Sequence, residues 1–147
     1  MALEIRPVRP EDEAAWRRLW ADYLVFYRVE LDGAVTDHTW ARLLDTDSRL
    51  AMRVAVVDGV VAGFAIHHFH ESTWSIAPDC YLEDLFVDPE FRGRGTGQAL
   101  IDDLIALAKQ NGWSRVYWHT ARDNSTARKL YDRYAEEDGH VRYRVEV

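Results

Sequence analysis

The sequence predicts a mixed α/β domain in which helices cover a central sheet. Its length of 147 residues suits one domain, so we expect residues 1–147 to fold as one unit. Hydrophobic residues make up 48% of the chain and charged residues 29%, a balance typical of globular proteins. Apolar strands alternate with segments of helical periodicity in the order β-α-α-β-β-β-α-β-α-β. We therefore expect a mixed, mostly antiparallel sheet with helices on both faces.

The first third of the chain predicts a strand and two helices. Residues 3–8 alternate in polarity, as a short strand does, and three acids at 11–13 favour a helix start. The helix that follows carries an aromatic stripe at helical spacing, made of Trp16, Trp20, Tyr23 and Tyr27. This stripe predicts core packing, with a pocket wall as the alternative for its end from Tyr23 to Tyr27. A second helix is expected over 37–44, capped by Thr36 or Asp37.

The middle of the chain predicts a β-hairpin. Asp58 and Gly59 form the dipeptide favoured by a two-residue type I′ turn. They separate a strand at 53–57 from one at 60–66, which continues to His70.

The second half of the chain predicts alternating strands and helices. We expect strands over 81–87, 115–119 and 140–147, and helices over 96–110 and 124–134. Asn111 and Gly112 suit the end of the first of these helices. In the closing strand, Tyr143, Val145 and Val147 share one face, a pattern that suits burial within one chain or pairing in a homodimer.

Composition and charge argue against several classes of protein. The formal net charge of −7 disfavours binding to nucleic acid. No apolar run approaches the ~20 residues of a membrane span and no secretory pattern opens the chain, so we expect a cytoplasmic protein without a membrane partner. The single cysteine, Cys80, excludes an internal disulfide and lacks the partners of a nucleophile. Residues 51–90 carry one basic and seven acidic side chains, which suits a cationic ligand.

The histidines and the loop after them predict no metal site. Strand alternation places only His68 and His70 on one face, apart from His67, and no third ligand is evident. These histidines could instead border a substrate groove. Trp74 lies in the following loop and is a candidate substrate contact. It is flanked by Glu71 and Asp79, which could bind a cation or form a solvated acidic loop.

A glycine-rich loop joins the strand at 81–87 to the helix at 96–110. It contains the run Arg92-Gly93-Arg94-Gly95-Thr96-Gly97-Gln98. Glycines let backbone N–H groups converge on an anion, and a helix N-terminus adds partial positive charge. The loop lacks the Gly-Lys-Ser/Thr ending of a nucleoside triphosphate loop and the Gly-x-Gly-x-x-Gly spacing of a dinucleotide fold. It therefore predicts a binding site for another phosphate-bearing ligand, with a solvated turn as the plain alternative.

A second motif lies on the helix at 124–134. Asn124, Ala127 and Tyr131 share one helical face, and the small residue between two polar ones would let a slender ligand pass. The alternatives are a simple N-cap for Asn124 and a core position for Tyr131.

These two motifs, Arg-x-x-Gly-x-Gly and Asn-x-x-Ala-x-x-x-Tyr, resemble those of the GCN-five-related N-acetyltransferase (GNAT) superfamily. The resemblance covers essentially the whole chain, because the order of elements also agrees. It implies acetyl-coenzyme A (acetyl-CoA) as co-substrate and no metal. The residues that it assigns to the co-substrate are Leu85, Phe86, Val87, Arg92, Gly93, Arg94, Gly95, Thr96, Gly97, Gln98, Asn124, Ala127 and Tyr131.

The resemblance also implies a reaction, in which an amine attacks the thioester directly. A free amine has a pKa near 10.4 and is almost entirely protonated at pH 7, so a proton acceptor is needed. The resemblance places Glu83 beside the acetyl group, where it would act either as general base or as anchor for a cationic acceptor. Backbone N–H groups near Phe86 and Val87 would stabilise the oxyanion, and Tyr131 would protonate the departing thiolate.

The acceptor stays open at this stage. The strand at 81–87 resembles the polyamine and diamine branch, whereas the strand at 116–118 and the helix from Asn124 resemble a branch that acetylates histones and polyamines. We expect a small cationic amine (a polyamine, a diamine or a lysine-like molecule), with a protein or peptide as the alternative. The candidate contacts are Tyr23, Tyr27, Glu83 and Trp74.

Two further expectations complete the sequence-based hypothesis. A non-catalytic module that binds coenzyme A (CoA) is the alternative of another class. A homodimer is expected because the resembling branch forms one. The acids at 132–138 depart from the superfamily pattern, so the start of the last strand, and its exchange between subunits, stay open.

Overall fold

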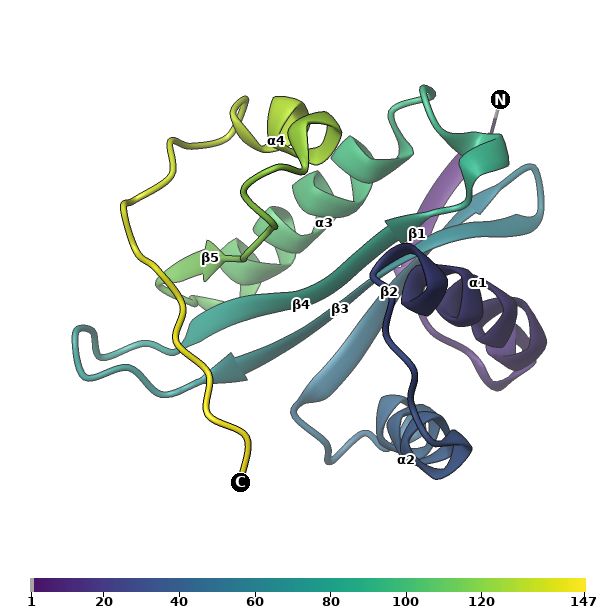
Figure 1. The fold of residues 1–147 in the computed structure, drawn as a ribbon, viewed down its shortest axis with the longest axis horizontal. Helices are drawn as coiled ribbons and strands as arrows, with labels where there is room; N and C mark the ends of the chain where they lie inside the picture. Colours follow the sequence, from purple (N-terminus) through teal and green to yellow (C-terminus); the bar gives the residue numbers. More distant parts are fainter. Residues whose placement is uncertain (1) are drawn as a thin grey trace.

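The computed structural model describes residues 2–147, which form a five-stranded sheet with helices on both faces (Figure 1). The strands are β1 (Leu3–Pro7), β2 (Leu50–Val57), β3 (Val60–His70), β4 (Asp79–Val87) and β5 (Arg115–Tyr117). The helices are η1 (Pro10–Asp12), α1 (Glu13–Phe26), α2 (Gly33–Leu44), η2 (Pro89–Phe91), α3 (Thr96–Asn111) and α4 (Ser125–Tyr131). The strands follow one another in chain order across the sheet, antiparallel except for the parallel pair β4–β5. The predicted fold class is confirmed.

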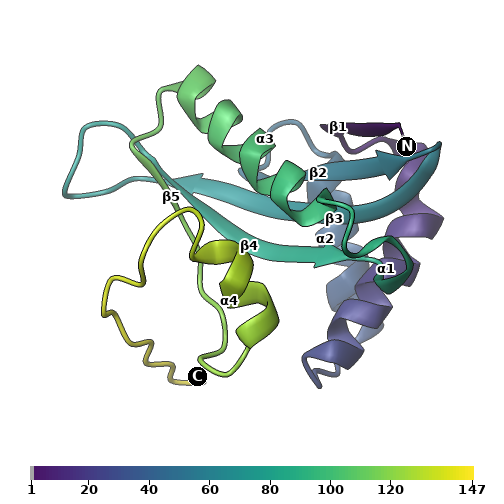
Figure 2. The same ribbon diagram turned by 90° about the horizontal axis from the view of Figure 1, so that it is seen from above.

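Helices α1 and α2 cover one face of the sheet, and Figure 2 shows α3 on the other. On the first face the start of the aromatic stripe is buried. Trp16 stacks on Trp20 at 5.4 Å and on Trp40 of α2 at 5.3 Å between ring centroids, above Phe64 of β3. The stripe thus forms core at its beginning, as predicted.

The second core layer lies between the sheet and α3. Leu100 and Leu104 of the helix pack on small and apolar strand residues, which are Ala55, Ala65, Cys80 and Leu82. Complete burial raises the pKa of the Cys80 thiol to about 12, so this cysteine behaves as a small apolar residue. Among the described residues, no helix has the length and apolarity needed to cross a membrane.

The hairpin between β2 and β3 has the predicted turn. Asp58 has a φ of 50° and Gly59 a φ of 82°, and a type I′ turn requires positive φ at both central residues. Strand β3 continues to His70, also as predicted.

Several element boundaries differ from the predictions, and strands β2 and β4 begin at Leu50 and Asp79, two or three residues earlier than expected. Helix α2 begins at Gly33 rather than at residue 37, because the Asp32 carboxylate accepts from the Ala34 N–H at 2.8 Å and caps the helix one turn earlier than expected. Strand β5 ends at Tyr117 rather than His119, where its pairing with β4 stops. Helix α4 ends at Tyr131, and the residues up to Tyr134 form turns instead.

The predicted closing strand over 140–147 is wrong. This segment pairs with no strand in the described structure, and Figure 1 shows it crossing in front of β4 and β3 as an extended chain. Tyr143 and Val145 are 90% and 84% exposed. Alternating polarity favours a strand, but a strand also needs a partner edge, and β5 offers only three residues.

Candidate active site

A cleft opens where β4 and β5 diverge. The two strands pair at only three positions, and the last pair joins Tyr81 to Tyr117. Beyond it, residues 82–87 of β4 have no neighbouring strand on that side within the described chain. Parallel strands that separate in this way leave backbone groups and side chains free to contact a ligand.

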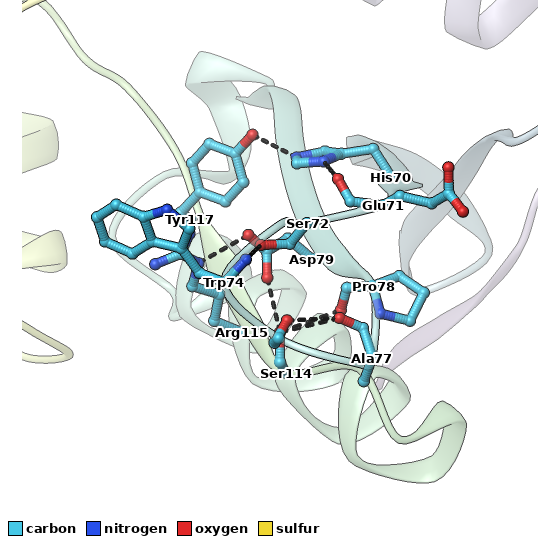
Figure 3. A network of polar contacts seen from close by, with 11 residues as sticks. His70, Glu71, Ser72, Trp74, Ala77, Pro78, Asp79, Ser114, Arg115 and Tyr117 are labelled. Carbon is cyan, nitrogen blue, oxygen red and sulfur yellow. Dashed lines mark hydrogen bonds and ion pairs between the residues drawn. The ribbon is translucent and has the colours of Figure 1, made fainter.

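The opposite end of the β4–β5 pair is held together by buried polar contacts, which Figure 3 shows. The buried Asp79 carboxylate accepts from Ser114 Oγ at 2.6 Å and from Arg115 Nε at 2.8 Å. Burial raises the pKa of Asp79, but these two hydrogen bonds outweigh it and hold the pKa below its ordinary value. His70 Nε2 lies 2.6 Å from the Tyr117 hydroxyl and joins β3 to β5. Asp79 is therefore part of this clamp and does not lie in a solvated acidic loop.

A bulge in β4 places two carboxylates at the cleft. Asp84 pairs with Ile66 of β3 and Leu82 pairs with His67, so Glu83 has no partner residue. In a regular strand Glu83 and Asp84 would point to opposite faces, whereas a bulge lets both reach one side. Both line the cleft.

The cleft has a volume of about 690 Å³ and lies between α1, β4, α4 and the C-terminal segment. Its lining includes the predicted substrate contacts Tyr23, Tyr27 and Glu83 and the predicted co-substrate contacts Leu85 and Tyr131. Thus residues from positions 23 to 131 meet in one cavity. The end of the aromatic stripe forms its wall.

Asp84 is the half-buried acid of the cleft, and no sequence motif singled it out. The Tyr23 hydroxyl donates to Asp84 Oδ1 at 2.6 Å. Burial raises the pKa of Asp84 to about 6, with a further rise from the Glu83 charge, while the bond from Tyr23 works in the opposite direction. Burial and the neighbouring carboxylate also raise the pKa of Tyr23, so its phenol stays protonated and donates. Asp84 thus combines cleft access with a pKa close to neutrality, as a general base requires.

Glu83 has a different environment from its neighbour. Its side chain is 46% exposed, and its Oε2 lies 3.7 Å from His68 Nε2. An exposed carboxylate of this kind can contact a cationic ligand at the mouth of the cleft.

Tyr131 lies on the wall opposite α1. Its ring packs edge-to-face against Trp118 at 5.4 Å between centroids. Burial raises its pKa to about 12, and the nearby Tyr27 adds to the rise. A phenol with this pKa is protonated at neutral pH and can donate a proton to an anion that forms beside it.

The glycine-rich loop has the geometry of an anion site. Gly93 and Gly95 have φ values of 76° and 77°, conformations that favour glycine. Gly95 caps α3, whose first N–H groups have no acceptor within the helix. Thr96 Oγ1 is buried without a hydrogen-bond partner. Such a cradle fits the phosphates of a nucleotide-like co-substrate.

Both loop arginines are exposed and form no ion pair with a carboxylate of residues 2–147. Arg92 Nε donates to the Val87 carbonyl at 3.1 Å, which holds the side chain against β4. The Arg92 guanidinium lies 5.4 Å from the centre of the Phe86 ring. Phe86 itself is buried in the core. Gly97 lies where α3 faces α4, and a Cβ there would make an ordinary contact with Leu130 Cδ2 at 3.4 Å.

Asn124 is the N-cap of α4, the simpler of its two interpretations. Its Oδ1 accepts from the Ala127 N–H at 3.3 Å. The cap fixes the start of a short helix that carries Tyr131 on its last turn.

Two further side chains lie away from the cleft. Trp74 is 83% exposed in the β3–β4 loop and does not line the cavity. His67 is buried on the α3 side of the sheet, where burial lowers its pKa to about 4. Within residues 2–147, no three His, Cys, Asp or Glu side chains are grouped to hold a metal ion.

Comparison with known proteins decides the family. The sequence profile of the Acetyltransferase (GNAT) family matches residues 11–135. The chain belongs to this family. It is an N-acetyltransferase with the GNAT fold, as the two motifs predicted.

Several relatives of this GNAT protein act on small amines by name. The D-amino-acid N-acetyltransferase of Saccharomyces cerevisiae is 31% identical over 142 residues, 95% of this chain and 88% of the relative. The thialysine N-epsilon-acetyltransferase of Bos taurus is 33% identical over 78 residues, 53% of this chain and 45% of the relative. The solved structure of AAC(6')-Iy in complex with the bisubstrate analog CoA-S-monomethyl-acetylneamine superposes with a TM-score of 0.82 at 25% identity, covering 100% and 99% of the two chains.

Proposed function

We propose that this protein transfers the acetyl group of acetyl-CoA to a small primary amine, with Asp84 as general base and Tyr131 as general acid. One observation carries the assignment of roles: a single cleft has the half-buried Asp84–Tyr23 pair on one wall and Tyr131 on another. The solved relative with a bisubstrate analog supports acetyl-CoA as the donor.

The glycine-rich loop provides the site for the donor's pyrophosphate. The N–H groups at the start of α3 and the guanidinium groups of Arg92 and Arg94 would bind the phosphates. Acetyl-CoA supplies an activated acetyl thioester. The unpaired stretch of β4, which includes Leu85, lies along the cleft, so it can orient the acyl group beside the two carboxylates.

The chain's own groups then move two protons. The acceptor reacts as its neutral amine, after its ammonium form has released one proton to solvent. The amine nitrogen then forms a bond to the acetyl carbon as it loses a second proton to Asp84 Oδ, which Tyr23 keeps oriented. The carbon–sulfur bond breaks, and Tyr131 Oη gives its proton to the departing sulfur. Proton exchange with solvent then deprotonates Asp84 and reprotonates Tyr131. Glu83, at the cleft mouth, holds a cationic part of the acceptor.

Acetyl-CoA turnover over a panel of amines tests this proposal. Release of the free thiol is followed with polyamines, diamines and lysine, and in parallel with histone peptides. We expect turnover with the small amines, and turnover with the peptides alone would favour a protein acetyltransferase. CoA binding without turnover of any amine would instead indicate the non-catalytic module.

A further inference from the structure

A second, smaller pocket lies beside the cleft, at the end of β2 and β3. Its volume is about 340 Å³. The pocket is lined by the end of α2, the loop into β2 and the last residues of β3, namely Arg42, Ser48, Arg49, Leu50, His68, Phe69 and His70. Strand β3 runs two residues past the start of β2, because Leu50 is the first residue of β2 and pairs with His68. The pocket occupies this step in the sheet.

Two arginines make the pocket basic, and neither has a carboxylate partner. Arg42 Nη2 contacts Thr39 Oγ1 at 3.3 Å, and the Arg49 guanidinium lies 5.7 Å from the centre of the Phe69 ring. Among residues 2–147, no carboxylate forms an ion pair with Arg42 or Arg49. Guanidinium groups bind carboxylates through paired, charge-assisted hydrogen bonds. The pocket therefore suits an anionic group.

His68 connects this basic pocket to the acidic side of the cleft. It lines the pocket, and its Nε2 lies 3.7 Å from Glu83 Oε2. Along β3, His68 is two residues from Ile66, the pairing partner of Asp84. Two residues of a strand span about 6 to 7 Å, which is the separation along β3 between the residue opposite Asp84 and the His68 that lines the basic pocket.

We propose that Arg42 and Arg49 form a carboxylate subsite for the acceptor, which is then an amino acid. Its reacting amine would lie at Asp84 and its carboxylate at the two arginines. This inference rests on the proposed function and adds the substrate class. A plain diamine or polyamine leaves the basic pocket without an anion, whereas a lysine-like amino acid matches both ends.

Lysine and cadaverine provide the matched test, because cadaverine is lysine without its carboxylate. The ratio of kcat/KM for lysine to that for cadaverine is measured with both enantiomers of lysine. For the native protein we expect one enantiomer of lysine to be preferred. In the Arg42→Gln, Arg49→Gln double variant, KM for lysine should rise about 10- to 100-fold, while kcat for lysine and both constants for cadaverine change little.

Lys109→Gln serves as the control, because it removes one exposed positive charge at the end of α3, on the opposite face of the sheet. It should leave the ratio unchanged. Unaltered CoA affinity in the double variant would show that the protein is folded.

The outcomes separate this inference from the proposed function. Equal use of cadaverine and lysine by the native protein, or a ratio that the double variant does not change, would overturn the carboxylate subsite and leave the acetyltransferase intact. Failure of the native protein to acetylate any amine would overturn both.

Discussion

Replacing Asp84 with asparagine should slow turnover and stabilise the fold in the same molecule. The change is nearly isosteric, and the amide oxygen of the new side chain can still accept the bond from Tyr23, which measures 2.6 Å in the native chain. It removes the negative charge and, with it, the ability to take a proton. Because general base catalysis is typically worth 10²- to 10⁴-fold, kcat should fall by about that factor.

The stability effect follows from the pKa of Asp84. The pKa rises from 3.8 for the free group to about 6 in the folded protein, so the folded state disfavours the charged carboxylate by about 3 kcal/mol. A carboxyl group with a raised pKa stabilises the fold fully below its unfolded pKa, and this contribution is lost as pH rises through about 6. Above pH 7 the Asp84→Asn variant avoids this cost, so its free energy of unfolding should exceed that of the native protein by up to about 3 kcal/mol. Near pH 4 the two proteins should be equally stable.

Urea unfolding at pH 4 and pH 8, together with thiol release at saturating amine, measures both effects. Glu83→Gln is the control, because that side chain is 46% exposed and its removal should change stability little. If Glu83 anchors the acceptor, this variant should mainly raise KM. A fully active Asp84→Asn protein, or one less stable than native at pH 8, would refute the assignment of Asp84 as a half-buried base.

Three other predictions test the rest of the site. Arg92→Ala should weaken CoA binding by about 1.5–3 kcal/mol, which calorimetry measures, and unchanged affinity would contradict the pyrophosphate assignment. Tyr131→Phe should lower kcat 10²- to 10⁴-fold with little change in CoA affinity, and full turnover where chemistry limits the rate would point to another acid, with Tyr134 next. We also propose a homodimer, since the extended segment at 140–147 leaves apolar side chains such as Tyr143 and Val145 exposed. Sedimentation at micromolar concentration should then give twice the monomer mass, and the monomer mass would rule it out.

Local signals predicted most of the fold, because they depend on residues close in sequence. The Asp58-Gly59 turn, the strand that runs on to His70 and the helix that begins at Thr96 all follow from short-range geometry. Asn124 capped its helix for the same reason. The two-part role of the aromatic stripe also followed from spacing, with Trp16 in the core and Tyr23 at the cleft.

The geometry of the site depends on a strand bulge and on contacts between distant residues, which no local sequence pattern encodes. The resemblance predicted Glu83 as the acid beside the acetyl group. The bulge in β4 lets Asp84 reach the cleft as well, where it accepts a hydrogen bond from Tyr23 of α1, 61 residues away in the sequence. The two adjacent acids in the strand predicted at 81–87 were the available signal. The closing segment failed for a related reason, since alternation at 140–147 describes the segment and says nothing of the edge that it must find.

Burial gives the two groups proposed as base and acid opposite charge states across a wide pH range. Burial raises the pKa of Asp84 to about 6 and that of Tyr131 to about 12, so between these values the carboxylate is charged and the phenol is neutral. The same physical cause, loss of water, thus prepares a base and an acid, because it disfavours the charged form of both. It follows that kcat should decrease as the pH is lowered through about 6, because Asp84 takes up a proton. Glu83→Gln should move this acidic limb of the pH profile to lower pH, because the Glu83 charge raises the pKa of Asp84. If the acidic limb of the pH profile lies at the same pH in Glu83→Gln as in the native protein, Asp84 is not the group that titrates.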